Sequence, residues 1–299
     1  MGNGADAKLR HPDKELQALI ADAEKPGTLL FTLNQLQHSA DEIRERISPD
    51  LYQFLNQLDD LTRSLINTAT VQQLSCNSDA LNQRIMQFGE ILTVLVAITG
   101  LTHENLTHGD GWRFITLGRR VERARFGATV LRHNVLQNKQ GSTHASPGNN
   151  TGNVAILENL LHVFDSIMTY RSRHQIDLSS AKVLHLLLQD ESNPRSVAFQ
   201  LAAINDEVLM LPGVNRNPRQ NRLLRLASNG LSHVRLVDAN ELFYFDEAFD
   251  HLQTQDRPQT QNFSTLMHTL ESIPAELANT LAANYFTHTE TRNALGSQA

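Results

Sequence analysis

Apolar residues recur along most of this chain at the three- and four-residue spacing of α-helices. The clearest example is the leucine stripe Leu55, Leu58, Leu61 and Leu65. Runs in which Val, Ile, Tyr and Thr alternate with polar residues, which are typical of strands, are absent. The pattern therefore predicts an all-α protein, a multi-helix bundle. Its predicted helices cover residues 12–24, 28–47, 49–74, 79–101, 110–135, 154–174, 179–188, 194–211, 221–252 and 263–284. The intervening 137–153, rich in Gly, Ser, Asn and Thr, is predicted to be a surface connection.

The helix predicted over residues 110–135 has two apolar faces instead of one. The first face consists of Leu117, Val121, Ala124, Ala128, Leu131 and Val135. The opposite face carries Trp112, Ile115 and Phe126 in the same arc as Arg119 and Glu122. A surface helix has a single apolar stripe. We therefore expect this helix in the middle of the fold, with Arg119 and Glu122 partly removed from water.

Buried charges require partners. Arg119 and Glu122 are three residues apart, so one helix can pair them. Arg120, Arg123 and Arg125 add cations without a matching carboxylate nearby. Two interpretations remain open: an internal lattice of ion pairs that fixes the helix, or a site for an anion.

Two other segments carry candidate residues for the same cluster. The segment Tyr170-Arg171-Ser172-Arg173 places two cations at a predicted helix end, which suits the helix dipole or an anion site. Arg195 lies just inside a helix expected to begin at Asn193-Pro194, where a cation is poorly placed for the dipole. We expect an acidic tertiary partner for it, with Asp190 or Glu191 nearest in sequence. Tyr285 and Phe286 are expected to dock the end of the last helix.

Residues 22–33 resemble residues 190–201 at an offset of 168 (Asp190 against Asp22). Asp, Pro, Phe and Leu are identical in place, and Thr28 faces Ser196. The match predicts two similar helical halves about a pseudo-twofold axis. We treat residues 1–299 as a single helical domain, in which 1–109 is an incomplete first half and 110–299 the second.

Composition excludes several classes of protein. The net charge of −6 argues against general nucleic-acid binding, which needs a dominant basic face. Cys76 is the only cysteine, so a disulfide framework is excluded. The chain opens without a signal peptide, and its longest apolar run, residues 91–101, is too short to span a bilayer. We expect a cytoplasmic protein that does not bind membranes.

Sequence motifs for catalysis are also absent. His103 and His108 form HExxxH, whose five-residue spacing does not match the HExxH of zinc sites. Phosphate-binding glycine loops, dinucleotide-binding turns and GxSxG are not found. We expect neither a metal nor a cofactor.

Several ordered motifs together resemble the bacterial alpha-E family. They are GWRF at 111–114, LGRRVERA at 117–124, TYRSR at 169–173, NPRSV at 193–197 and YF at 285–286. The resemblance implies an α-helical domain with an "ER" motif, here Glu122-Arg123. It also implies companions: a circularly permuted ATP-grasp-like protein and a transglutaminase-like cysteine peptidase protein. Such a context points to formation or modification of a peptide or amide bond.

The start of the chain departs from that family pattern. Members usually open with a further helix that carries its own ER motif, and this chain begins MGNGADAKLR. The repeat agrees, because the counterpart of Glu122 would precede Met1. We expect that helix to be missing or to belong to another polypeptide.

Three functions fit these residues. The first is a non-catalytic helical partner of an ATP-grasp-type ligase. The second is an amide-bond-forming enzyme in which Glu122 is the acid or base and the arginines hold a carboxylate or phosphate. The third is a structural domain without a ligand. The candidate cluster for any ligand is Trp112, Arg119, Arg120, Glu122, Arg123, Tyr170, Arg171, Arg173 and Arg195.

The second apolar face generates a test of self-association. Without a sister helix, the face bearing Trp112, Ile115 and Phe126 is left partly open, and large apolar patches are uncommon on monomers. The 299-residue chain should therefore self-associate or bind a hydrophobic dye in light-scattering and fluorescence measurements. A monodisperse monomer that binds no dye would show that other helices cover Trp112.

Overall fold

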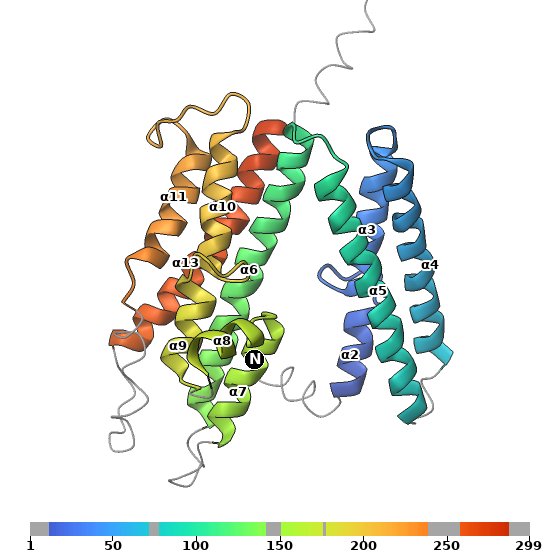
Figure 1. Cartoon of the computed structure of the whole chain (residues 1–299), viewed down its shortest axis with the longest axis horizontal. Helices are drawn as coiled ribbons and strands as arrows, with labels where there is room; N and C mark the ends of the chain where they lie inside the picture. Colours follow the sequence, from blue (N-terminus) through green and yellow to red (C-terminus); the bar gives the residue numbers. More distant parts are fainter. Residues whose placement is uncertain (1–11, 72–77, 142–150, 176–177, 239–257, 287–299) are drawn as a thin grey trace, which may run out of the picture. The chain divides into compact units, whose positions relative to one another are not determined.

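The computed structural model describes residues 12–71, 78–141, 151–175, 178–238 and 258–286 (Figure 1). In these ranges the chain forms helices and no strand, which confirms the all-α prediction. The chain divides into two compact units, Met1–His108 and Gly109–Ala299. Each unit has its own buried core and is described by itself.

The first unit contains α2 (Pro12–Ala21), α3 (Leu29–Glu42), the short 3₁₀ turn η1 (Arg44–Arg46), α4 (Pro49–Val71) and α5 (Ser78–Glu104). Helix α4 packs between α3 and α5. The predicted leucine stripe of α4 faces this core: Leu55, Leu58 and Leu65 are buried, and Leu61 packs against the cluster. Ile91 and Val94 of α5 complete it.

Helix α5 corrects the expectation that no segment is long enough to cross a membrane. Its segment Asn82–Glu104 has the length and hydropathy of a membrane span. The expectation failed because it considered only residues 91–101, whereas the helix begins earlier. A core helix of a soluble protein passes the same test, so length and composition alone do not assign a span to α5.

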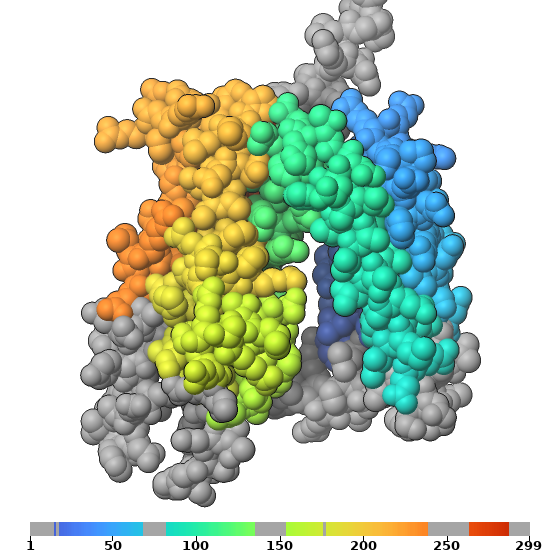
Figure 2. All heavy atoms as spheres, in the orientation of Figure 1, coloured from blue at the N-terminus to red at the C-terminus, as the bar shows by residue number. Residues whose placement is uncertain are grey.

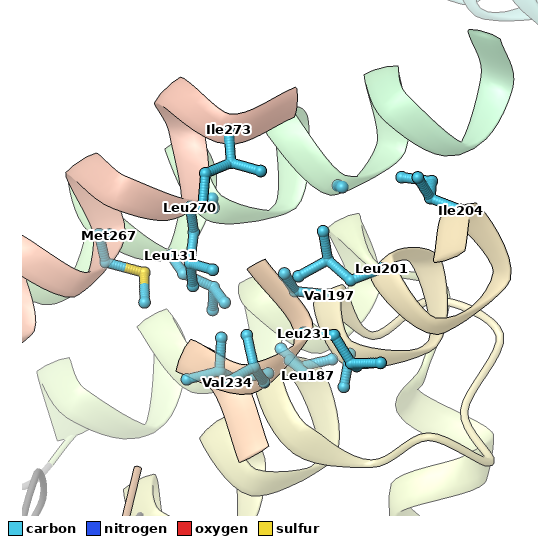
Figure 3. Close-up of a cluster of buried hydrophobic side chains, with 14 of the residues drawn as sticks. Leu131, Leu187, Val197, Leu201, Ile204, Leu231, Val234, Met267, Leu270 and Ile273 are labelled. Carbon is cyan, nitrogen blue, oxygen red and sulfur yellow. The ribbon is translucent and has the colours of Figure 1, made fainter. Parts of the chain in front are cut away.

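The second unit is organised around a bundle of four helices: α6 (Asp110–Gly141), α10 (Val197–Leu209), α11 (Arg222–Arg235) and α13 (Pro258–Tyr285). Helix α6 packs on α10 and α13, and α11 packs on the same two helices. Figure 3 shows their side chains meeting in one core, with Leu131 from α6, Leu201 from α10, Val234 from α11 and Leu270 from α13.

Shorter helices close one end of this bundle (Figure 1). They are α7 (Thr151–Val163), α8 (Ile167–His174), α9 (Ser180–Leu184) and the π-helical turn η3 (His185–Gln189). η3 contacts α6, α10 and α11, and its residues Leu186, Leu187 and Leu188 are all buried. At the other end, Tyr285 and Phe286 pack on Phe114, with ring centroids 5.1 and 5.2 Å apart, so the expected docking of Tyr285 and Phe286 is confirmed.

Helix α6 buries one of its two predicted apolar faces. Leu117, Val121, Ala124, Ala128 and Leu131 are all 3% exposed or less, as predicted. On the opposite face Ile115 is 37% and Phe126 55% exposed, so the predicted burial of α6 on both sides is wrong. The reason is that α10 and α13 cover only one arc of the helix. The side chain of Val135 lies outside the described residues.

The helix predicted over residues 154–174 is two helices. After Val163 the Ser166 N–H donates to Leu161 O (2.8 Å) and the Asp165 N–H to His162 O (2.9 Å). Asp165 has a φ of 49°, in the left-handed region. These features make a Schellman motif, which ends α7. The sequence concealed this break because the motif usually places glycine where this chain has Asp165.

Other element boundaries also differ from the prediction. Helix α6 continues to Gly141 and α7 begins at Thr151, so the predicted connection 137–153 is helical at both ends; residues 142–150 lie outside the described ranges. The helix predicted to end near residue 252 is α11, which ends at Arg235; residues 239–257 are not described.

The two segments of the sequence repeat share one turn. Thr28 Oγ donates to Asp22 O, and Ser196 Oγ donates to Asp190 O. The Glu24 N–H donates to Asp22 Oδ1 (2.9 Å), just as the Ser192 N–H donates to Asp190 Oδ1 (2.8 Å). Helices α3 and α10 then begin at equivalent positions. Relation of the whole halves by a twofold axis stays a prediction.

Close packing of α11 between its neighbours gives a stability test at Gly230. A Cβ added there would lie 3.2 Å from both Leu201 Cδ2 and Ile273 Cγ2. Gly230→Val should therefore overpack the core and cost about 1–3 kcal/mol. Gly118→Val is the matched control, because nothing lies within 4 Å of an added Cβ at that exposed helical site. Urea denaturation should leave the control within about 0.5 kcal/mol of the wild type; equal losses in both variants would contradict this packing.

Candidate functional site

The start of α10 is buried and polar. Ser196, its N-cap, accepts a hydrogen bond from the Phe199 N–H (3.0 Å) and is 0% exposed. The predicted start at Asn193-Pro194 is therefore wrong by three residues. Asn193 is instead drawn into the core, where its Nδ2 donates to Leu186 O (3.0 Å) and Ser166 Oγ (3.3 Å). A buried amide needs such partners within the protein, because water does not reach it.

Ion pairs hold the turn that leads into α10. Arg173 of α8 pairs with Asp190 and also donates to Ser192 Oγ (3.0 Å). Arg235 of α11 donates through Nε to Glu191 Oε1 (2.6 Å). Both acids nearest to Arg195 are thus engaged elsewhere. In the space-filling view, α7, α8 and the chain before α10 form one continuous surface (Figure 2).

Arg195 has an acidic tertiary partner, as expected, but a different one. Its Nη2 lies 3.0 Å from Asp165 Oδ2, in the turn that ends α7. Sequence distance misled the choice of Asp190 or Glu191, because the chain reverses at Asp165 and brings that carboxylate back to the start of α10. The Asp165 side chain is 78% exposed, so its pairing with Arg195 is well screened by water.

Two of the candidate residues of α8 bond to the turns around α9 and α10. Tyr170 is buried, and its hydroxyl accepts a hydrogen bond from the Ser179 N–H (3.1 Å). Arg173 is used by Asp190, and Arg171 is exposed. Tyr170 and Arg173 therefore position the turns around α9 and α10.

Two arginines that the sequence analysis left out join α6 to its neighbours. Arg113 Nη1 lies 2.9 Å from Glu207 Oε2 of α10, and Arg132 Nε lies 2.7 Å from Glu271 Oε1 of α13. Both flank the buried stripe of α6. Their partners are far away in sequence, so spacing along α6 gave no signal for these pairs.

Arg120 points to the buried start of α10. Its Nη1 donates to Gln200 Oε1 (3.2 Å), and its guanidinium carbon lies 5.0 Å from the centroid of the Phe199 ring. Gln200, which is 0% exposed, donates in turn to Pro194 O. Sequence reasoning missed Gln200, since one glutamine on an apolar helix carries no motif. An amide oxygen satisfies the geometry of Arg120 but does not neutralise its charge.

The remaining arginines of the α6 cluster have no carboxylate bonded to them among the described residues. Arg119 is partly buried, Arg123 is exposed, and neither makes an ion pair in the part of the chain that the structure describes. Glu122 is exposed and forms no ion pair with Arg119 there, so its predicted burial is wrong. It lies outside the arc covered by α10 and α13. Trp112, about two turns before Arg119 on the same helix, is partly buried.

Burial, and after it repulsion between neighbouring arginines, lowers the pKa of two of these side chains. The pKa of Arg120 is lowered by burial and by the neighbouring Arg119. The pKa of Arg123 is lowered by partial burial and by Arg195, Arg120 and Arg119. Both directions mean that the charged form is less favourable here than in water. Part of the cluster is therefore an ion-pair lattice, and part is uncompensated positive charge.

The histidines of the HExxxH segment contact each other at the end of α5. Their ring centroids lie 5.7 Å apart, and His103 Nδ1 lies 3.1 Å from Glu104 Oε1. No group of three or more His, Cys, Asp or Glu side chains suited to a metal occurs among the residues that the structure describes.

Comparison with known proteins identifies the family. The Alpha-E family, described as a predicted alpha-helical domain with a conserved ER motif, matches residues 2–286. The chain belongs to this family. Uncharacterised proteins of Mycobacterium tuberculosis (Rv2567) and Mycobacterium bovis (Mb2597) are each 27% identical over 209 residues. These matches cover 70% of this chain and 22% of each relative. No solved structure matches the chain.

In this Alpha-E protein the two residues of the Glu122-Arg123 dipeptide differ in environment: the carboxylate is exposed, and the guanidinium lies near other arginines. Glu122 is directed away from the core stripe, whereas Arg123 is close enough to Arg195 for the two charges to repel each other. The dipeptide therefore does not act as an internal salt bridge.

The pair of Arg173 and Asp190 gives a pH-dependent stability test. Burial raises the pKa of Asp190, but hydrogen bonds from Ser192 and Arg173 lower it by more, so the folded-state pKa lies below its ordinary value. The pair therefore stabilises the fold above the ordinary carboxylate pKa of about 4, and this stability is lost as pH falls through the folded-state pKa. Arg173→Gln should lower the free energy of unfolding at about pH 7, and the deficit should shrink below about pH 4.

Arg171→Gln is the control for this test. Arg171 lies on the same helix, is exposed and forms no ion pair in the described part of the chain. Urea denaturation across the pH range in which the wild type stays folded should show little change for this variant. A deficit in Arg173→Gln that does not vary with pH would mean that the arginine stabilises by packing alone.

Proposed function

We propose that this Alpha-E protein is a non-catalytic helical partner in a system that forms or modifies peptide or amide bonds. Its companions in the proposal are an ATP-grasp-type ligase and a transglutaminase-like peptidase. The observation that carries the proposal is the length of the relatives. The chain spans about a fifth of the curated relatives it matches, since the match covers 22% of each. In these relatives the matching region is one part of a longer polypeptide, as expected of a module that works beside other domains.

The site geometry favours the partner over the enzyme of the alternative hypothesis. That enzyme needs Glu122 held by arginines as an acid or base, and a catalytic carboxylate is normally positioned by such partners. Glu122 is exposed and forms no ion pair with the described arginines. Arg113 and Arg132 of the same helix instead connect α6 to α10 and α13, through Glu207 and Glu271. A cytoplasmic location, where ATP is available, belongs to the same proposal.

Turnover of ATP by the separate and mixed proteins tests the proposal. The assay would use the proposed ATP-grasp-type ligase alone, the chain alone, and both together with candidate amine and carboxylate substrates. ATP turnover should rise only in the mixture, and Glu122→Gln should leave that rise unchanged. The chain alone should release no ADP.

Two outcomes would contradict the partner role. ADP release by the chain alone that disappears in Glu122→Gln would establish the enzyme instead. A mixture no more active than the ligase-like protein by itself, together with the absence of a complex in size-exclusion chromatography, would remove the ligase as a partner.

A further inference from the structure

Four cations gather where α6 passes the start of α10. Arg119, Arg120 and Arg123 come from two consecutive turns of α6, and Arg195 precedes α10 by two residues. Arg120 is placed by Gln200 and by the Phe199 ring, and Arg195 by Asp165. A Cβ added at Gly127, one turn after Arg123, would lie 3.1 Å from Val197 Cγ2 and 3.4 Å from Phe164 Cε1, so this part of α6 lies against the residues next to Arg195 and Asp165. The four arginines come from separate elements, so the fold assembles the cluster.

The negative charge bonded to this group is too small to balance it. Asp165 is the carboxylate that binds a member of the cluster, and its own side chain is 78% exposed. Glu207 attracts Arg120, but it already pairs with Arg113 at 2.9 Å. Four guanidinium groups therefore face one dedicated carboxylate among the described residues. Repulsion among these cations destabilises the free protein, and an anion bound between them would reduce that repulsion.

Two neighbouring features suit an anion as well. The N-terminal end of α10 carries a partial positive charge, and α10 is 13 residues long, so its dipole adds to the field of the arginines. Thr116, one turn before Arg119 and Arg120 on α6, is 5% exposed, and its hydroxyl has no hydrogen-bond partner among the described residues. A buried hydroxyl without a partner is uncommon, and a bound oxyanion can satisfy it.

We propose that Arg119, Arg120, Arg123 and Arg195 form a binding site for a phosphate dianion, either free or as a phosphate monoester. Guanidinium groups bind phosphate oxygens with paired, charge-assisted hydrogen bonds. The excess of three positive charges, four arginines less Asp165, matches a dianion better than a carboxylate. The proposal concerns the isolated chain and is independent of the partner role.

Calorimetric titration with inorganic phosphate tests the site, with ionic strength held constant by sodium chloride. The site variant is Arg119→Gln/Arg123→Gln, because these two arginines form no ion pair with the described residues and their loss leaves no bonded partner exposed. The control variant is Arg125→Gln/Arg171→Gln, which removes the same charge from exposed helical positions outside the cluster. The site variant should bind phosphate at least about tenfold more weakly than the wild type, whereas the control should match the wild type.

Melting in chloride provides a second measurement that does not depend on the ligand. Relief of repulsion should leave the site variant as stable as the wild type or more so, which also shows that it folds. Glycerol 3-phosphate then distinguishes the two sources: tighter binding than inorganic phosphate assigns an ester, and weaker binding assigns the free ion. The proposal is overturned if the wild type releases no binding heat at millimolar phosphate. It is equally overturned if the two double variants lose the same affinity for phosphate, or if acetate binds as tightly as phosphate.

Discussion

The second unit depends on the need to satisfy polar groups that enter its core at the start of α10. Asn193, Ser196 and Gln200 are 2%, 0% and 0% exposed, so water cannot bond them. Each finds its partner in the protein: Asn193 in Leu186 O, Ser196 in Asp190 O, and Gln200 in Pro194 O. An unpaired buried polar group costs about 1–3 kcal/mol, so these bonds leave the turn little freedom. They set where α10 begins and how it lies against α6 and η3.

Placement of α10 then divides the arginines of α6 into two kinds. Arg113 and Arg132, at the edges of the buried stripe, reach Glu207 and Glu271 and connect α6 to α10 and α13. Arg120 reaches only the neutral amide of Gln200, while Arg119 and Arg123 lie where no described carboxylate is bonded to them. The ion-pair interpretation thus applies to only part of the positive charge of α6, and the anion site stays a proposal. Ion pairs hold α6 to its neighbours, and Arg119, Arg120 and Arg123 are left without a bonded carboxylate among the described residues.

The turn before α10 is used a second time in the first unit. There Thr28, 1% exposed, takes the place of Ser196 and bonds Asp22 O in the way that Ser196 bonds Asp190 O. Both hydroxyls connect a helix start to the preceding helix end through a carbonyl six residues earlier. The recurrence explains why Asp, Pro and a hydroxyl residue are kept together in both segments. No arginine follows Pro26, where Gly27 stands in place of Arg195, so only the second copy joins a cationic cluster.

The all-α class, most helix positions and the buried stripe of α6 could be predicted from the sequence. These follow from the spacing of apolar residues, because a helix places residues three and four apart on one face whatever it packs against. The sequence match also paired Asp22 with Asp190 and Thr28 with Ser196, whereas the hydrogen bonds of these residues were seen only in the structure. The end of α7 was not recognised, because Asp165 adopts a left-handed conformation usually found in glycine. The start of α10 was placed too early, because the Asn193 side chain bonds within the core and does not cap the helix.

The pairing of the charges could not be predicted, because the partners come together only when the helices pack. Arg195 is bonded to Asp165, thirty positions away, and Arg113 to Glu207, ninety-four positions away. The packing of the helices also leaves Glu122 and Phe126 exposed, although the sequence pattern placed Phe126 on one apolar face of α6 with Trp112 and Ile115. The physical reason is that burial and electrostatic pairing depend on which other helix covers each arc of α6. That information lies in the distances between elements, and spacing within one helix does not contain it.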